Sequence, residues 1–282
     1  MGLATALLVL ASALIHAVWN AILKRTREPE KAVIGVVVAS AASAFGVWAV
    51  TGAPLPPPRS IAWCLASGLL EAFYFVTLAR ALARAPLGPV YTVVRGGALV
   101  VVWPISIAFL GERPTAAMIA GTLLVVLGLA STGAAEMPRG DDAPLARRLG
   151  WAFVCAFFVG AYQVAYKLAL ASGGHAGAVV AISLGSACVA NLAVLGRARA
   201  RGAIDALRAE PVRVLGAGVL TSIGFAVFLF AMTRAGAGAV VTLRNTSILF
   251  AQVVALFLGE RPKRLGVIGA VLVTGGAVFL AR

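Results

Sequence analysis

Ten apolar stretches, each about long enough to cross a bilayer as a helix, follow one another along this chain with short polar breaks between them. A spanning helix uses about 20 predominantly apolar residues, so ten of them take roughly 200 residues. The chain has 282 residues, of which 61% are hydrophobic and 12% are charged. Soluble domains carry about twice that share of charged residues. The sequence therefore predicts an all-α integral membrane protein and leaves no room for a soluble domain.

The polar breaks indicate where each helix lies. We expect transmembrane helices near 3–23, 32–51, 61–83, 87–110 and 115–134, and again near 149–170, 176–196, 212–233, 237–258 and 264–281. The longest break, 135–148, contains prolines, aspartates and arginines and is predicted to be a polar linker. It separates a first five-helix repeat, 1–134, from a second five-helix repeat, 149–282. No lysine or arginine precedes the first apolar stretch, so we expect a retained helix there and not a cleaved signal peptide.

The two halves of the chain are related in sequence. The tetrapeptide Gly-Glu-Arg-Pro at 111–114 recurs 148 residues later at 259–262, and Arg84-Ala85 recurs 150 residues later as Arg234-Ala235. Because each half has an odd number of expected spans, the second half must enter the membrane from the opposite side. This predicts two inverted repeats. Many secondary transporters are built in this way, with the substrate site near the midplane between the repeats.

Basic residues are concentrated in the breaks between helices. The chain carries 24 lysines and arginines against 10 acidic residues, a net charge of +14. In these positions the cations act as topology signals and lipid headgroup contacts, and a nucleic-acid partner is not expected. With sides alternating along the chain, 17 of them lie on one side and five on the side that holds both termini. The positive-inside rule then predicts that both termini lie outside the cytoplasm. The expected location is a bacterial-type cytoplasmic (inner) membrane.

Three segments resemble a family of membrane carriers. These are 16–24 (HAVWNAILK), 90–97 (VYTVVRGG) and the duplicated Leu-Gly-Glu-Arg-Pro that ends two of the expected helices. They are similar to the EamA-like branch of the drug/metabolite transporter superfamily, and the resemblance covers essentially the whole chain. It implies a ten-helix inverted-repeat carrier that exports small metabolites such as amino acids, with a cavity lined mainly by helices 1, 3, 4, 6, 8 and 9.

The same resemblance leaves two points open. The His-x-x-Trp-Asn pattern of the first helix and the Tyr-x-x-x-Arg-Gly pattern of the fourth are also similar to phosphonate-utilisation-associated membrane proteins. Relatives in the superfamily usually have cytoplasmic termini, which is the reverse of the orientation that the charge count predicts. Substrate and orientation therefore stay open at this stage.

Three ionisable side chains are expected inside the bilayer. Arg95, Arg244 and Glu71 each lie near the middle of an expected helix. Such residues are candidates for function, because a charge at the bilayer centre costs at least about 2.5–3.5 kcal/mol on insertion scales. Two guanidiniums against one carboxylate leave one cation unpaired, and a carboxylate or phosphonate of the substrate would supply the missing anion. The alternative is structural, with Arg95 paired to Glu71 and Arg244 extended toward the headgroups.

Polar and aromatic side chains at similar depth complete the candidate site. We expect substrate contacts by stacking and hydrogen bonding from Trp19, Asn20, Tyr74, Tyr91, Trp103, Tyr162, Gln163 and Tyr166. Glu71 and His16 are the candidates for proton coupling, although His16 also suits a buried structural role. No metal or other cofactor is predicted, because the other histidine, His175, is in a loop and the three cysteines lack Cys-x-x-Cys spacing.

Glycines and prolines suggest where helices approach one another or open. Gly96, Gly97 and Pro104 would permit close helix contact, a local opening or a kink in the helix expected at 87–110. Small-residue faces suited to tight packing or dimer contact occur in two further helices, at Gly121, Gly128, Gly266, Gly269, Gly275 and Gly276.

These features favour a secondary active transporter that exports a small amino acid, another carboxylate or a phosphonate by alternating access around a central cavity. An intramembrane enzyme is one alternative, since Ser12 and His16 share a helix face, but neither Gly-x-Ser-x-Gly nor His-Glu-x-x-His occurs. A lipid flippase-type subunit is another. The expected partners are the small-molecule substrate and membrane lipid, and the chain is expected to be a monomer or a weak homodimer.

Overall fold

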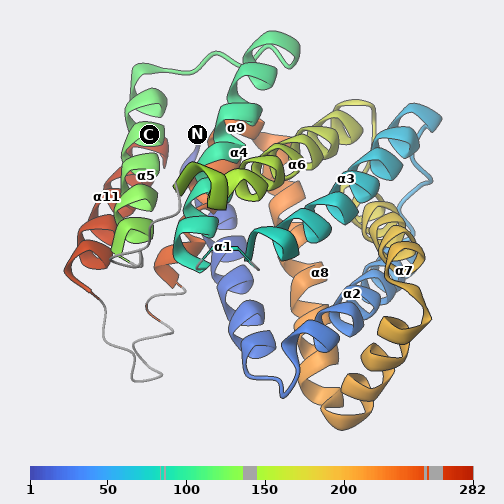
Figure 1. Cartoon of the computed structure of the whole chain (residues 1–282). Helices are drawn as coiled ribbons and strands as arrows, with labels where there is room; N and C mark the ends of the chain where they lie inside the picture. Colours follow the sequence, from blue (N-terminus) through green and yellow to red (C-terminus); the bar gives the residue numbers. More distant parts are fainter. Residues whose placement is uncertain (83, 86, 136–144, 251–252, 254–262, 282) are drawn as a thin grey trace.

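The structure, a computed structural model, describes residues 1–282 except 83, 86, 136–144, 251–252, 254–262 and 282 (Figure 1). Its helices are α1 (Leu3–Lys24), α2 (Pro29–Thr51), α3 (Pro58–Leu82), α4 (Leu87–Phe109), α5 (Ala116–Ala135), α6 (Leu145–Ala171), α7 (Ala176–Ala209), α8 (Pro211–Arg234), α9 (Ala237–Arg244) and α11 (Arg264–Ala281). Within the described chain, nine helices are long and apolar enough to cross a membrane. The protein is therefore an all-α integral membrane protein, as the composition predicts.

Prolines and glycines fix several helix ends close to the expected positions. Pro29, Pro58 and Pro211 are each the first residue of a helix, where the missing N–H costs no intrahelical bond. Helix α2 ends at Gly52, whose φ of 62° is in the left-handed region. The linker expected at 135–148 falls mostly outside the described residues, so the division into two repeats stays a prediction.

Helix α7 is longer than expected. The apolar pattern predicts an end near residue 196, but the helix continues to Ala209. The added segment is rich in alanine and arginine, which are strong helix formers. It ends at Ala209, one residue before Glu210, and Pro211 then begins the next helix. Many of the basic residues expected in a loop therefore lie on a helix that extends beyond the apolar span.

The expected helix at 237–258 is interrupted. Helix α9 ends at Arg244, Asn245 and Thr246 form a turn, and helix resumes at residue 247. The N–H groups of Asn245 and Thr246 bond three residues back, to the carbonyls of Thr242 and Leu243. Asn, Thr and Ser side chains compete with the backbone for hydrogen bonds, which explains why the helix breaks in this short polar run.

Helix α4, in contrast, runs without interruption through Gly96, Gly97 and Pro104. A Cβ built on Gly97 would lie 2.8 Å from the Cβ of Ala156, so this glycine lets α6 approach α4 closely. Of the roles expected for the glycines after Arg95, the structure shows close approach at Gly97. The helix that is interrupted is the one expected at 237–258, where α9 ends at Arg244.

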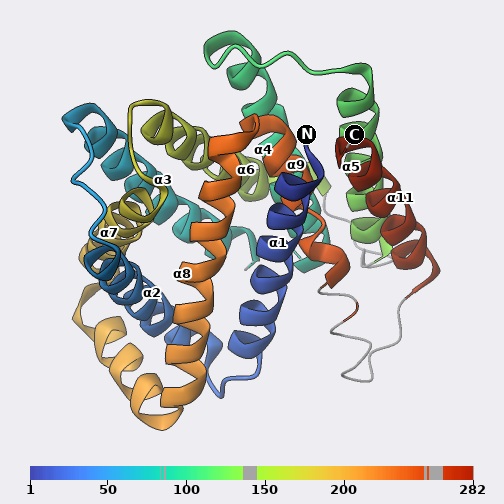
Figure 2. The same ribbon diagram turned by 180° about the vertical axis from the view of Figure 1, so that it is seen from behind.

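Helices of the first half pack mainly on helices of the second. α1 packs on α8 and α3 on α6, α2 packs on α7 and α8, α3 on α7, and α5 on α11 (Figures 1 and 2). We can exchange the halves by matching α1–α5 in order to α6, α7, α8, α9 and α11. The pairs α2–α7 and α5–α11 then map onto themselves, and each of the others becomes another pair of the same set. The two halves are therefore interlocked, and the hydrophobic core lies between them.

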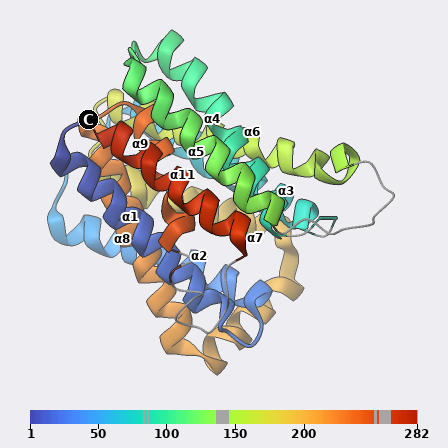
Figure 3. The same cartoon turned by 90° about the vertical axis from the view of Figure 1, so that its left-hand side faces the viewer.

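α5 and α11 lie side by side at one edge of the molecule and pack along glycines (Figure 3). A Cβ built on Gly276 would lie 2.5 Å from the carbonyl oxygen of Gly121, and one built on Gly128 would lie 2.7 Å from that of Gly269. No real side chain tolerates such distances, so the two backbones are in direct contact. The small-residue faces expected from the sequence thus pack against each other within one chain.

Glu112 caps helix α9. It follows Gly111, whose left-handed φ of 67° turns the chain after α4. The carboxylate of Glu112 accepts hydrogen bonds from the backbone N–H groups of Ala237 and Gly238, at the first turn of α9. An anion is favourable at a helix N-terminus because the helix dipole is positive there. The Gly-Glu-Arg-Pro motif, expected at a helix end, therefore joins two helices; its second copy lies outside the described residues.

Lys167 of α6 binds the end of α8, just before the start of α9 that Glu112 caps. Its Nζ donates to the carbonyl oxygens of Met232, at 2.6 Å, and Ala235, at 2.9 Å, where α8 ends. A cation is favourable at a helix C-terminus, where the last carbonyls have no intrahelical partner. Together Glu112 and Lys167 fix the turn between α8 and α9.

Replacing Glu112 with alanine is expected to destabilise the protein by about 1–2 kcal/mol, since it removes both acceptors from the α9 N-terminus. The melting temperature of the purified protein in detergent should fall. The adjacent Arg113 is exposed, and Arg113→Ala is the matched control that should leave the melting temperature almost unchanged. Equal shifts for the two variants would contradict the cap.

Candidate functional site

A cavity lies in the middle of the bundle and is lined by eight helices from both halves. Its lining residues are His16, Trp19, Asn20, Val33, Val36, Val37, Ser40, Glu71, Tyr74, Phe75, Leu78, Val94, Arg95, Val159, Tyr162, Leu184, Ala187, Thr221, Phe225 and Arg244. None of them belongs to α5 or α11. The lining runs from mid-helix positions toward the end of α1, the start of α2 and the end of α3. The cavity therefore extends toward the face where α1 meets α2.

His16, Trp19 and Arg95 form one corner of this cavity, called here the donor corner. Nε2 of His16 lies 2.8 Å from Nη2 of Arg95, and Nδ1 of His16 lies 3.2 Å from Nε1 of Trp19. Indole and guanidinium nitrogens only donate, and a neutral imidazole accepts at one of its two nitrogens. At least one of the two contacts therefore brings N–H groups face to face.

Glu71 of α3 is the one carboxylate among the lining residues and is 4% exposed. Its Oε2 accepts a hydrogen bond of 3.2 Å from the hydroxyl of Tyr166 on α6. Tyr162 packs edge-on against Tyr166 and contacts the ring of Tyr74. Glu71 is thus held among tyrosines, while Arg95 contacts His16.

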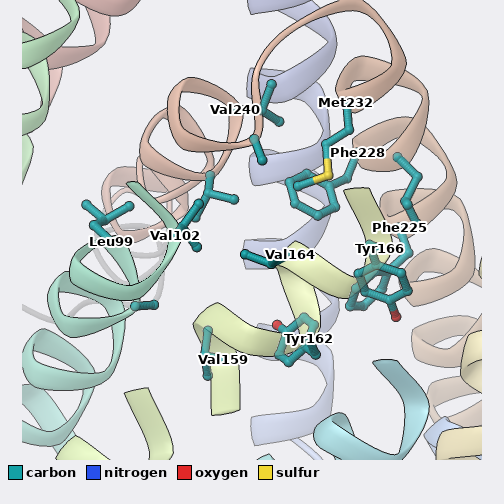
Figure 4. Packing of buried hydrophobic residues seen from close by; sticks show 14 of the residues in the cluster. Leu99, Val102, Val159, Tyr162, Val164, Tyr166, Phe225, Phe228, Met232 and Val240 are labelled. Atoms are coloured by element: carbon teal, nitrogen blue, oxygen red, sulfur yellow. The ribbon is translucent and has the colours of Figure 1, made fainter. Parts of the chain in front are cut away.

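Arg244, at the end of α9, is held between aromatic rings of α8. Its Cζ lies 3.9 Å from the ring centre of Phe228 and 4.7 Å from that of Phe225, within the range of cation–π attraction. Figure 4 shows the Phe225 ring beside that of Tyr166, with 6.0 Å between the ring centres. Arg244 is 5% exposed, and its Nε has no hydrogen-bond partner among the described residues. The guanidinium is therefore inside the bundle, with a donor left over.

The cavity brings together eight of the twelve side chains proposed from the sequence for substrate binding or proton coupling: His16, Trp19, Asn20, Glu71, Tyr74, Arg95, Tyr162 and Arg244. Tyr166 is buried outside the lining and bonds to Glu71. Trp103 lies elsewhere. Its Nε1 donates to Oγ1 of Thr242 at 3.2 Å, and its ring lies against Gly238, so it joins α4 to α9. Gln163 is buried in α6 outside the lining. The side chain of Tyr91 lies outside the described residues.

Phe75 and Phe225 line the cavity but were not proposed for it. A signal for them was present, because they occupy equivalent positions 150 residues apart in the two halves. Ser40 and Thr221 are further lining residues that the sequence reasoning did not place at the site. Serine and threonine are so common in apolar helices that their presence does not indicate a binding site.

Metal ligands are not gathered in the described part of the chain. No group of three histidine, cysteine or acidic side chains there could hold a metal ion. Cys64 and Cys155 are buried and Cys188 is partly buried, all as free thiols. The chemistry that the cavity offers is therefore that of guanidinium, imidazole, carboxyl, hydroxyl and aromatic groups.

Comparisons with known proteins agree with this architecture. A sequence model of the EamA-like transporter family matches residues 147–282. Among solved structures, one described only as a crystal structure of a protein aligns with a TM-score of 0.74 over 98% of this chain and 97% of the other, at 19% identity. At that identity the likeness concerns the fold alone. No curated protein matches the chain.

Proposed function

We propose that this chain, which belongs to the EamA-like transporter family, is a secondary active transporter that exports a small organic anion or zwitterion, such as an amino acid, another carboxylate or a phosphonate. Membership of this family, together with the nine apolar helices in the described part of the chain, makes it an integral membrane transporter of small molecules. The substrate class, the direction and the mechanism are the proposed part.

The excess of guanidinium over carboxylate groups in the cavity lining is the observation that supports an anionic substrate group most directly. Two guanidiniums face one carboxylate, and that carboxylate already accepts from Tyr166. Nε of Arg244 is buried and has no hydrogen-bond partner among the described residues. Leaving charged donors without partners in a low-dielectric interior is unfavourable. A carboxylate or phosphonate would supply the oxygens, and guanidinium forks match both groups.

Alternating access is supported by two features of the fold. The packing pairs map onto one another when the halves are exchanged, as expected for inverted repeats that enclose a site between them. The turn at Asn245 and Thr246 interrupts a helix directly after a cavity-lining arginine. Broken helices at the binding site are common in transporters of this construction, because the ends of the two helix segments supply polar backbone groups.

The proposed direction of transport, export, rests on the membrane orientation predicted from the distribution of basic residues. The cavity extends toward the face where α1 meets α2; the turn there carries Arg25 and Arg27, and Lys31 follows in the first turn of α2. That face belongs to the more basic side of the chain, which the positive-inside rule places in the cytoplasm. The cavity would then load its substrate from inside the cell.

The geometry of Ser12 and His16, the serine–histidine pair considered for an intramembrane enzyme, does not favour catalysis. The hydroxyl of Ser12 donates to the carbonyl oxygen of Gly224 at 2.8 Å, which joins α1 to α8. His16 faces Arg95 and Trp19 instead. Neither side chain is arranged as a nucleophile with its base, which must lie within hydrogen-bond reach of each other.

Counterflow in liposomes tests the proposal. Liposomes containing the purified chain and loaded with an unlabelled amino acid, carboxylate or phosphonate should accumulate the same labelled compound well above empty liposomes. A neutral sugar or amine of similar size should not accumulate. Failure of every anionic and zwitterionic compound, in protein that is folded in the membrane, would reject the proposed function.

A further inference from the structure

Arg244 is held inside the bundle by aromatic rings and by no ion pair of the described chain. Its Cζ lies 3.9 Å from the ring centre of Phe228 and 4.7 Å from that of Phe225, both on α8 (Figure 4). The ion pairs among the described residues lie elsewhere, at Lys31 and Arg213. A cation over the face of a ring is attracted to it without using its N–H groups as hydrogen-bond donors. The contact with the rings therefore occupies none of the donors of this guanidinium.

Contacts of the same kind occur at the surface of the protein, where they leave no donor dry. Arg234 lies over the ring of Phe230, with 4.3 Å between Cζ and the ring centre. Arg80 lies over the ring of Trp151, with 4.6 Å between them. Both of these arginines are exposed, so water can satisfy their donors. Arg244 is 5% exposed, and its Nε is buried with no partner among the described residues. An acceptor that enters the cavity, which Arg244 lines, would supply the missing bond.

The two rings beside Arg244 take different places relative to the cavity. Phe225 is among the lining residues, so it can touch a bound molecule directly. Phe228 is not among them, and its exposed fraction is 0%. It can act on a bound molecule only through neighbouring residues, and the cationic one of these is Arg244. A role of Phe228 in binding would therefore be a role in holding that arginine.

A comparison of the two halves shows that the ring at position 228 is not a general feature of the repeat. Phe225 has an equivalent phenylalanine 150 residues earlier, whereas Phe228 corresponds to Leu78. The arginine of the first half, Arg95, contacts the imidazole of His16. The additional aromatic residue thus occurs in the half whose arginine lies against it.

From this arrangement we infer that Phe228 is a positioning residue for anion binding. Its ring holds the guanidinium of Arg244 at the cavity wall, so that the N–H groups are presented to the carboxylate or phosphonate of the substrate. A planar guanidinium that is already held in place loses less conformational freedom on binding than a mobile one. The inference rests on the proposed function and adds to it the residue that fixes where the anionic group binds.

A fluorine series at position 228 of the full-length protein tests the inference. Mono-, di- and trifluorophenylalanine nearly keep the shape of the ring, but each fluorine withdraws electron density from the ring face and weakens its attraction for a cation. The probes are labelled alanine, lactate and methylphosphonate, one for each substrate class, in proteoliposomes. For each probe that the wild type takes up, KM should rise with every fluorine, by about tenfold over the series, the factor that corresponds to about 1.4 kcal/mol. kcat should change little.

The matched control is the same series at Phe230. Its ring carries Arg234 in an equivalent contact outside the cavity, so KM should stay at the wild-type value. Phe228→Leu, which introduces the residue that the first half has at this position, should raise KM about as much as trifluorophenylalanine does. Size-exclusion chromatography shows whether that variant is folded.

Arg244→Gln separates positioning from packing. In this background the fluorine series should leave the residual uptake unchanged, because the cation that the ring attracts is gone. A wild-type KM that does not respond to fluorine at position 228, or one that rises equally in Arg244→Gln, would overturn the inference, since Phe228 would then act through packing alone. No uptake of any amino acid, carboxylate or phosphonate by the wild type would instead reject the proposed function, on which the inference rests.

Discussion

Replacing Arg95 with glutamine is expected to lower the initial rate of anion uptake about 30-fold or more. Arg95 contributes a guanidinium with a planar pair of donors to a partly buried corner of the cavity, in contact with His16. Removing one partner of a desolvated charged contact costs about 2–5 kcal/mol, and each 1.4 kcal/mol is a factor of ten. The measurement is the uptake rate in proteoliposomes at substrate concentrations below the KM.

Two further variants interpret that result. Arg95→Lys keeps the charge but loses the fork, so its rate should lie between wild type and Arg95→Gln. Arg80→Gln removes an exposed arginine of similar reach and should transport as wild type does. Wild-type uptake by Arg95→Gln would exclude Arg95 from the substrate site. Size-exclusion chromatography of each variant separates a binding defect from a folding defect.

A single methyl group at Gly276 is expected to destabilise the protein by about 2 kcal/mol, the usual size of an overpacking effect. The Cβ of Gly276→Ala would lie 2.5 Å from the carbonyl oxygen of Gly121 and 3.0 Å from the backbone nitrogen of Val125. Both contacts are with backbone, which cannot turn aside as a flexible side chain does. α5 and α11 would have to separate. Thermal unfolding in detergent, followed by circular dichroism, measures the change.

The neighbouring glycine is the matched control. A Cβ on Gly275 would approach only Cδ1 of Leu124, at 3.9 Å, which is an ordinary contact. Gly275→Ala should therefore be neutral or raise stability by up to about 1 kcal/mol, because alanine is the better helix former. Opposite effects at two adjacent positions distinguish helix packing from helix propensity. A neutral Gly276→Ala would show that the contact between α5 and α11 is loose.

The membrane-spanning helices could be located from the sequence because the hydrophobic requirement of the bilayer leaves a strong pattern. Pro29, Pro58 and Pro211 then mark helix starts within a few residues of the apolar limits. The end of α7 was missed because an arginine- and alanine-rich segment is polar enough for a loop but forms helix readily. The break after Arg244 was missed because hydropathy does not register a turn of two residues inside an apolar stretch.

Most residues of the candidate site could be predicted from the sequence, because few charged and aromatic residues occur near the middle of a helix. Their mutual arrangement could not, because it depends on which helices cross. That Arg95 faces His16 and that Tyr166 faces Glu71 follows from contacts between α4 and α1 and between α6 and α3. Trp103 is of a residue type common in cavities, but Gly238 has no side chain and leaves room for its ring. The ring therefore packs in the contact between α4 and α9.

The glycine contact between α5 and α11 has a practical consequence for imaging this protein. Small membrane proteins without a soluble domain give particles that are difficult to align by electron microscopy, and an antibody fragment bound as a fiducial must not disturb the working parts. α5 and α11 contribute no residue to the cavity lining and hold each other through their backbones. The exposed ends of this helix pair are therefore the epitope of choice, one that leaves ligand entry unobstructed.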